Sequence, residues 1–86
     1  MNMTTQLDLL QRDWCEAAEP IVLLMMRGAP FTTDDIRDYL PEPANHNHFG
    51  VLMARMKNRG LVARITYRPS KRPEANGRPI AVWTVL

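Results

Sequence analysis

The chain has 86 residues, of which 45% are hydrophobic and 23% are charged, and its formal net charge is +2. This length predicts one small domain with a modest core, and the composition is too apolar for an intrinsically disordered protein. The longest apolar run covers only residues 21–26, far fewer than the ~20 residues of a membrane-spanning helix, and no signal peptide or disulfide is expected.

The first predicted element is a helix within residues 1–28. Its apolar residues recur at steps of three and four, the period of one helical face, and are Leu7, Leu10, Trp14, Ala17, Ile21 and Leu24. Pro20 cannot donate a helical hydrogen bond and restricts the residue before it. We therefore expect a break or kink near residues 18–19, with a second helical piece that ends before Gly28.

Two more helices are predicted within residues 32–60. Hydroxyl residues at 32–33, followed by Asp34 and Asp35, are typical of a helix start, and this short helix ends before Pro41. Asn45 or Asn47 then caps a longer helix that reaches residue 59. The buried face expected for that helix consists of Phe49, Leu52, Met53 and Met56.

The last predicted segment, residues 61–86, is extended. Alternation of Leu61, Ala63, Ile65 and Tyr67 with Val62, Arg64, Thr66 and Arg68 predicts a half-buried strand. A second strand is expected over residues 80–86. The three prolines between the strands argue against regular structure there, and the dipeptide at 76–77, Asn-Gly, indicates a turn.

This order of elements predicts an α+β fold of the winged helix-turn-helix class, with three or four helices followed by a two-stranded β-hairpin wing. Residues 1–86 are expected to form a single domain: an N-terminal helical segment (1–28), a helix-turn-helix (32–60) and the wing (61–86). In this fold class the third helix enters the major groove of DNA, and the hairpin loop contacts the flanking backbone or minor groove.

The charge is divided unevenly along the chain. Residues 1–43 carry three arginines and eight acidic residues, whereas residues 44–86 carry eight basic residues and one acidic residue. The net charges of the two halves are thus −5 and +7. Such a dipole suits one end of the molecule to a polyanion. The alternative is that the acidic half neutralises the basic half within the fold or in a dimer.

The third helix and the loop supply the candidate DNA contacts. Opposite the apolar face, one arc of the helix collects Asn47, Gly50, Val51, Ala54, Arg55 and Asn58. Asn and Arg make bidentate contacts with base edges, and the small residues allow close approach to the groove. Contacts with phosphates are expected from Lys57 and Arg59 on the helix and from Arg68, Lys71, Arg72 and Arg78 on the proline-stiffened loop. The alternatives are close helix packing at Gly50 and Ala54 and a solvated basic loop.

The loop also resembles a known group of proteins. The pattern Ser70-x-Arg72-Pro73-x-x-x-Gly77-Arg78-Pro79-x-x-x-Trp83 and the helix entry Phe31-Thr32-Thr33-Asp34-Asp35-Ile36 are similar to small winged-helix proteins from bacteriophages of actinobacteria. The resemblance covers residues 30–86. It implies a phage origin and a DNA-binding helix-turn-helix protein, in which Arg72, Gly77, Arg78 and Trp83 are characteristic.

Catalysis is not expected. His46 and His48 are too few for a metal site, and the acidic neighbours of Cys15 are expected to raise the pKa of its thiol. Neither a phosphate-binding glycine loop nor a Ser/His/Asp arrangement is present. The two tryptophans are interpreted as core residues. We therefore predict no enzymatic activity, no metal and no cofactor.

The sequence thus predicts a cytoplasmic protein, associated with the nucleoid when bound to double-stranded DNA, that acts as a transcriptional regulator or as an accessory in replication or recombination. The alternative is a protein-interaction module that uses the same frame to bind a host or phage protein. The apolar run at 21–26 exceeds the needs of a small core, which suggests a homodimer through the N-terminal helices or a foreign partner.

Overall fold

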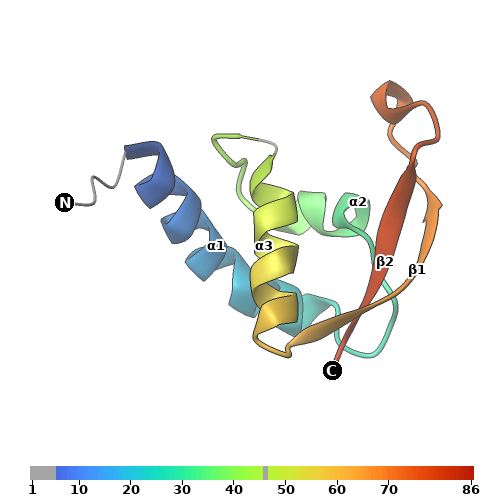
Figure 1. The fold of residues 1–86 in the computed structure, drawn as a ribbon, viewed down its shortest axis with the longest axis horizontal. Coiled ribbons are helices and arrows are strands. Elements are labelled where there is room, and N and C mark those ends of the chain that lie inside the picture. Colours follow the sequence, from blue (N-terminus) through green and yellow to red (C-terminus); the bar gives the residue numbers. More distant parts are fainter. Residues whose placement is uncertain (1–5, 46) are drawn as a thin grey trace.

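The computed structural model describes residues 6–45 and 47–86, with side chains described from residue 10 onward. Over this part of the chain the order is α1 (Gln6–Met25), α2 (Thr33–Ile36), the 3-10 turn η1 (Arg37–Tyr39), α3 (Asn47–Asn58), β1 (Val62–Pro69), the 3-10 turn η2 (Pro73–Ala75) and β2 (Pro79–Val85). The predicted α+β class is confirmed, and three helices followed by an antiparallel hairpin are compatible with a winged-helix layout. Figure 1 shows α3 between α1 and the hairpin.

Helix α1 continues through Pro20, so the predicted break at residues 18–19 is wrong. Pro20 is exposed, and so is Glu16, whose carbonyl group loses its helical partner there. Water can satisfy this carbonyl on the outer side of the helix. On the inner side Ala18 and Val22 are buried in the core, and their packing holds the two halves of α1 in one helix.

The buried face of α1 also differs from the predicted one. Trp14 is buried, but Leu10 is 46% exposed and Leu24 is 78% exposed, and Ala17 is exposed as well. The side chain of Leu7 lies outside the described residues. The face that packs in the core consists of Trp14, Cys15, Ala18 and Val22. The compact side chains at 15 and 18 allow α3 to approach closely, which a row of leucines would prevent.

Helix α3 buries the face that its sequence predicts. Phe49, Leu52, Met53 and Met56 are all at most 5% exposed, and they meet α1, α2 and the hairpin in one hydrophobic cluster. Both tryptophans belong to this cluster, as predicted. The indole Nε1–H of Trp14 donates to the carbonyl of Pro41 over 2.8 Å, and its ring packs edge-on against Phe49 with centroids 5.2 Å apart.

The predicted start of α2 is confirmed in detail. Thr32 is the N-cap, and its hydroxyl accepts a hydrogen bond from the backbone N–H of Asp35. The Asp35 carboxylate in turn accepts from the backbone N–H of Thr32 over 2.8 Å. This reciprocal capping box satisfies two backbone donors of a helix with only four residues.

Strands β1 and β2 pair antiparallel, and β2 also forms a bridge to Phe31, which exchanges two backbone hydrogen bonds with Trp83. The predicted alternation of β1 is wrong: Val62 is buried, whereas Ile65 and Tyr67 are 53% and 55% exposed. The register shifts between Arg64 and Thr66. This irregularity interrupts the regular alternation of side chains between the two faces of the strand, on which the prediction depended.

Within residues 6–45 and 47–86, the helices lack the combination of length and apolarity that crossing a membrane requires.

Because α3 lies at the centre of the fold, shortening one of its buried side chains is expected to destabilise the protein strongly. Leu52 is 0% exposed in the middle of the cluster. Leu52→Ala is expected to lower the free energy of unfolding by about 2–5 kcal/mol, because it removes buried methyl groups and leaves a cavity. Leu86→Ala serves as the control, since Leu86 is 72% exposed. That change is expected to stay within about 0.5 kcal/mol in chemical denaturation, and equal losses for both variants would contradict the packing described.

Candidate nucleic-acid interface

The outward face of α3 carries only small and polar side chains. Its exposed residues include Asn47, Gly50, Ala54, Lys57 and Asn58. Val51, also a predicted contact, is half-buried beside them. A Cβ atom added at Gly50 would meet nothing within 4 Å, so the space above this residue is open. The helix backbone is therefore accessible along this face, as close approach to a groove requires.

Two predicted contacts, Arg55 and Arg59, are engaged with α1. The Nη1 of Arg59 lies 2.6 Å from Oε1 of Glu19, and the Nη2 of Arg55 lies 3.5 Å from Oε2. The Glu19 side chain is only 8% exposed, so its carboxylate depends on these guanidinium groups for compensation. The Arg59 side chain is 59% exposed and remains open to a second anion, whereas that of Arg55 is 32% exposed.

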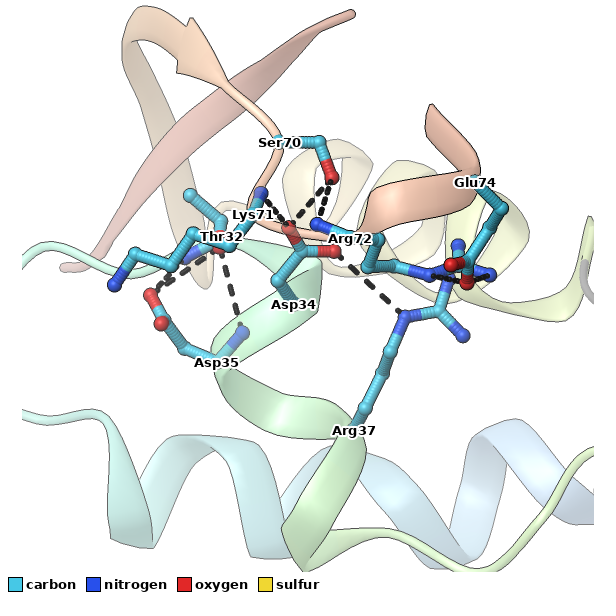
Figure 2. Close-up of polar contacts among 8 residues, drawn as sticks. All are labelled: Thr32, Asp34, Asp35, Arg37, Ser70, Lys71, Arg72 and Glu74. Carbon is cyan, nitrogen blue, oxygen red and sulfur yellow. Dashed lines mark hydrogen bonds and ion pairs between the residues drawn. The ribbon is translucent and has the colours of Figure 1, made fainter. Parts of the chain in front are cut away.

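The base of the wing is fastened to the start of α2 by Asp34 (Figure 2). Its Oδ2 accepts hydrogen bonds from the Ser70 hydroxyl over 2.8 Å and from the backbone N–H of Lys71 over 3.1 Å. Ser70 Oγ also accepts from the backbone N–H of Arg72. Ser70 is only 9% exposed, so this residue of the loop motif holds the wing in place.

Asp35 makes a second link between α2 and the hairpin. Its Oδ2 accepts from Nη2 of Arg68 over 2.8 Å, and the same oxygen caps the helix through the N–H of Thr32. The predicted phosphate contact Arg68 is thus part of the fold, although its side chain is still 40% exposed. We call Asp34, Asp35, Arg68 and Ser70 the wing clamp.

The tip of the wing turns at Asn76 and Gly77, as the sequence predicts. Both residues have positive φ angles, 51° and 73°, which an Asn-Gly pair adopts at low cost. The loop is closed by a 2.8 Å hydrogen bond from the Ser70 N–H to the Arg78 carbonyl. The side chains of Lys71 and Arg78 are exposed, and the structure shows no ion pair for either within the described residues.

Arg72 points along the loop to Glu74. Its Nε and Nη2 lie 2.8 Å and 2.6 Å from Oε1 of Glu74. The backbone N–H of Glu74 and the Arg72 side chain donate to this carboxylate and lower its pKa. The predicted contact Arg72 is therefore paired locally in the free protein.

Arg37 is a cation that the sequence analysis missed. Its guanidinium lies 4.2 Å above the Phe49 ring, and its Nε is 3.8 Å from Oδ1 of Asp34. Burial and the nearby positive charge of Arg72 lower the pKa of Arg37. Within the described residues its buried Nε has no hydrogen-bond partner. The i,i+3 spacing of Asp34 and Arg37 was the sequence signal that could have indicated this contact. The contact places the guanidinium of Arg37 at the base of the wing, in addition to that of Arg72.

The residues considered for catalysis are buried or fall outside the description. Cys15 is fully buried, and the pKa of its thiol is raised, as predicted, but mainly by burial, with Glu19 and Glu16 adding to it and Arg55 opposing it. His48 is also buried and packs against Trp14, while His46 lies outside the described residues. Among the residues that are described, no three His, Cys, Asp or Glu side chains are grouped to hold a metal ion.

No family of known proteins matches this chain, and neither a curated protein nor a solved structure does so. The candidate interface therefore depends on the geometry described above.

The wing clamp predicts a specific loss of order. Asp34→Ala removes the acceptor of two hydrogen bonds to the wing base. It is expected to lower the free energy of unfolding by about 1–3 kcal/mol and to speed amide exchange at Ser70–Arg72. The exposed Asp38 of the neighbouring turn provides the control, as Asp38→Ala is expected to change neither quantity appreciably. Unchanged exchange in Asp34→Ala would show that the wing is held by something else.

The Glu74 carboxyl predicts a pH response at the wing tip. Because its pKa is lowered in the folded state, its pairing with Arg72 is complete above the unfolded pKa and is lost as the pH falls through the folded pKa. An NMR titration of the side-chain carboxyl is expected to give a midpoint below the ordinary value of 4.5. Arg72→Gln is expected to raise this midpoint, whereas Lys71→Gln leaves the hydrogen bonds to Glu74 intact. A wild-type midpoint at or above the ordinary value would contradict the pairing.

Proposed function

We propose that this protein binds double-stranded DNA, with α3 in the major groove and the wing against the adjacent backbone. The observation that carries the proposal is the outward face of α3, where small and polar side chains leave the helix backbone accessible beside an ordered basic wing. Such a face suits a helix in the major groove, because small residues allow close approach of the backbone and polar side chains can contact base edges.

The residues divide into two roles. Asn47 and Asn58 contact base edges, since Asn pairs with adenine in a bidentate manner. Phosphates are contacted by four of the exposed cations of the helix and wing, which are Lys57, Arg59, Lys71 and Arg78. Arg55 keeps α3 against α1 through Glu19 rather than reading a base. Ala54 and Val51 contribute apolar contact with thymine methyl groups.

The wing clamp supports this role, because it fixes the wing before DNA arrives. A loop ordered in advance loses less conformational entropy on binding than a free one. Arg72 is held near Arg37 at the base of the loop, where exchange of Glu74 for a phosphate would bring two guanidinium groups to one anion. Arg72 therefore contacts the phosphate only in the complex.

The resemblance of the loop motif to phage winged-helix proteins supports a phage protein that acts in the bacterial cytoplasm, as a transcriptional regulator or as an accessory in replication or recombination. A second candidate function is binding of a host or phage protein. It is favoured by the exposed apolar residues of β1, Ile65 and Tyr67. The two functions differ in salt dependence, because contacts with phosphates weaken as salt rises and an apolar interface does not.

The test is binding to a labelled DNA duplex, followed by fluorescence anisotropy at several salt concentrations. Wild type is expected to bind with an affinity that falls steeply with salt. Lys71→Ala/Arg78→Ala is expected to bind more weakly and to reduce the slope of log K against log salt by about two, one for each lost phosphate contact. Absence of binding even at low salt would overturn the proposal.

A matched pair of substitutions at Gly50 tests the position of the helix. Gly50→Ala adds a methyl group into open space and is expected to keep binding while stabilising the helix by up to about 1 kcal/mol. Gly50→Glu adds a carboxylate at the same point and is expected to abolish binding by repelling the phosphates. Wild-type affinity in folded Gly50→Glu would show that DNA does not approach α3.

A further inference from the structure

Two guanidinium groups at the base of the wing share one carboxylate neighbour. Figure 2 shows Arg37 pointing toward the ion pair that Arg72 forms with Glu74. Burial lowers the pKa of Arg37 most, the positive charge of Arg72 lowers it further, and the carboxylates of Asp34, Glu42 and Glu74 oppose both effects. The two cations are thus close enough to repel one another, and an anion between them relieves this repulsion. We call Arg37 and Arg72 the guanidinium pair.

Both members of the pair are supported from behind by the fold. Arg37 lies 4.2 Å over the Phe49 ring of α3, and its side chain is only 25% exposed. The backbone N–H of Arg72 donates to the hydroxyl of Ser70, a buried residue of the wing clamp. Asp34 joins the two supports, because its Oδ1 lies 3.8 Å from Nε of Arg37 and its Oδ2 accepts from Ser70. The places of both residues therefore follow from α2, α3 and the wing clamp.

The carboxylate that occupies the pair is an imperfect ligand for it. Arg72 directs two nitrogens, Nε and Nη2, at a single oxygen of Glu74, over 2.8 Å and 2.6 Å. A guanidinium edge pairs best with two oxygens, one for each N–H group, and a phosphate group offers them. The Glu74 side chain is 61% exposed, against 32% for Arg72, so the carboxylate lies on the solvent side and can turn away without disturbing the core.

The place of the pair in the fold favours a phosphate of a nucleic-acid backbone. Phe49, below Arg37, lies in the first turn of α3 and is followed by Gly50 on the outward face. Arg72 lies in the wing loop beside the exposed Lys71. The pair therefore lies between the two surfaces that we propose to contact DNA, and a backbone that touches both surfaces passes near it.

We infer that Arg37 and Arg72 form a binding site for one phosphate group, and that Glu74 occupies this site in the free protein as an internal competitor. An entering phosphate displaces the carboxylate into solvent and accepts hydrogen bonds from Arg72 with two oxygens. Glu74 thus weakens phosphate binding by competing for the site, in addition to the repulsion that any nearby carboxylate exerts. For a phosphate of the DNA backbone, the inference rests on the function proposed above.

The first test uses inorganic phosphate as the probe, at constant ionic strength and without DNA. An NMR titration is expected to shift the side-chain Nε–H signals of Arg37 and Arg72. Glu74→Gln is expected to lower the dissociation constant about two- to fivefold, because it removes an exposed ion pair that competes with the probe. The matched control is Glu42→Gln, which removes the same charge from an exposed residue outside the wing and is expected to leave the constant near the wild-type value. Equal effects of the two variants, or unshifted arginine signals, would overturn the inference.

The second test examines whether the gain depends on Arg72. In an Arg72→Gln background, Glu74→Gln is expected to change the dissociation constant for inorganic phosphate no more than Glu42→Gln does, because the competitor has lost its partner. A gain that persists without Arg72 would mean that Glu74 acts through long-range charge alone, and the competition would then be wrong.

A third measurement separates the inference from the proposed function. Binding to a DNA duplex at low salt is compared for wild type, Glu74→Gln and Glu42→Gln. A larger gain in Glu74→Gln assigns the site to a backbone phosphate. If the duplex does not bind but inorganic phosphate behaves as expected, the proposed function fails and the site takes a free phosphate group. If the duplex binds with equal gains in the two variants, DNA binding stands and the inferred competition is wrong.

Discussion

Two carboxylates at the start of α2 connect the helical part of the molecule to the hairpin. Asp35 caps its own helix and binds Arg68 with the same oxygen, and Asp34 accepts two hydrogen bonds from the base of the wing. A four-residue helix has little stability alone. Its cap and the wing therefore stabilise one another, and the position of the wing relative to α3 follows from the position of these two side chains.

The opposite charges of the two halves meet inside the fold at several points. Glu19 binds Arg55 and Arg59, and Asp35 binds Arg68, so acidic residues of the first half neutralise basic residues of the second. The fold thus combines ion pairs between the two halves with basic residues that stay exposed. The charge pattern of the sequence alone left these two outcomes open as alternatives. The exposed cations of α3, its C-terminal end and the hairpin are therefore fewer than the eight basic residues of the second half, and they are Lys57, Arg59, Arg64, Lys71 and Arg78.

Local signals in the sequence were sufficient for most of the elements. The hydroxyl cap at Thr32, the buried face of α3 and the Asn76–Gly77 turn all depend on residues that are close in the chain, and each is found where it was predicted. The same reasoning failed at Pro20, because packing of α1 against the rest of the core outweighs one missing hydrogen bond. Local rules hold where no distant contact competes with them.

The errors at the candidate site have a common origin in contacts between distant residues. Glu19 and Arg59 are 40 positions apart, and Asp34 and Ser70 are 36 apart, so no periodicity reveals that these side chains meet. The sequence therefore identified Arg55, Arg59 and Arg68 as free cations. It identified the exposed face of α3 correctly, because that face is the remainder of a helix whose buried face is clear.

The two buried tryptophans make the cooperativity of this small fold observable by its intrinsic emission. Trp14 lies where α1 meets Phe49 of α3, and Trp83 lies in β2 between β1 and Phe31. Each indole therefore reports on a different region, one on the packing of helices and the other on the sheet. Chains that retain a single tryptophan would show whether the hairpin melts with the helices or separately, and hence whether the carboxylates of α2 join the two parts into one thermodynamic unit.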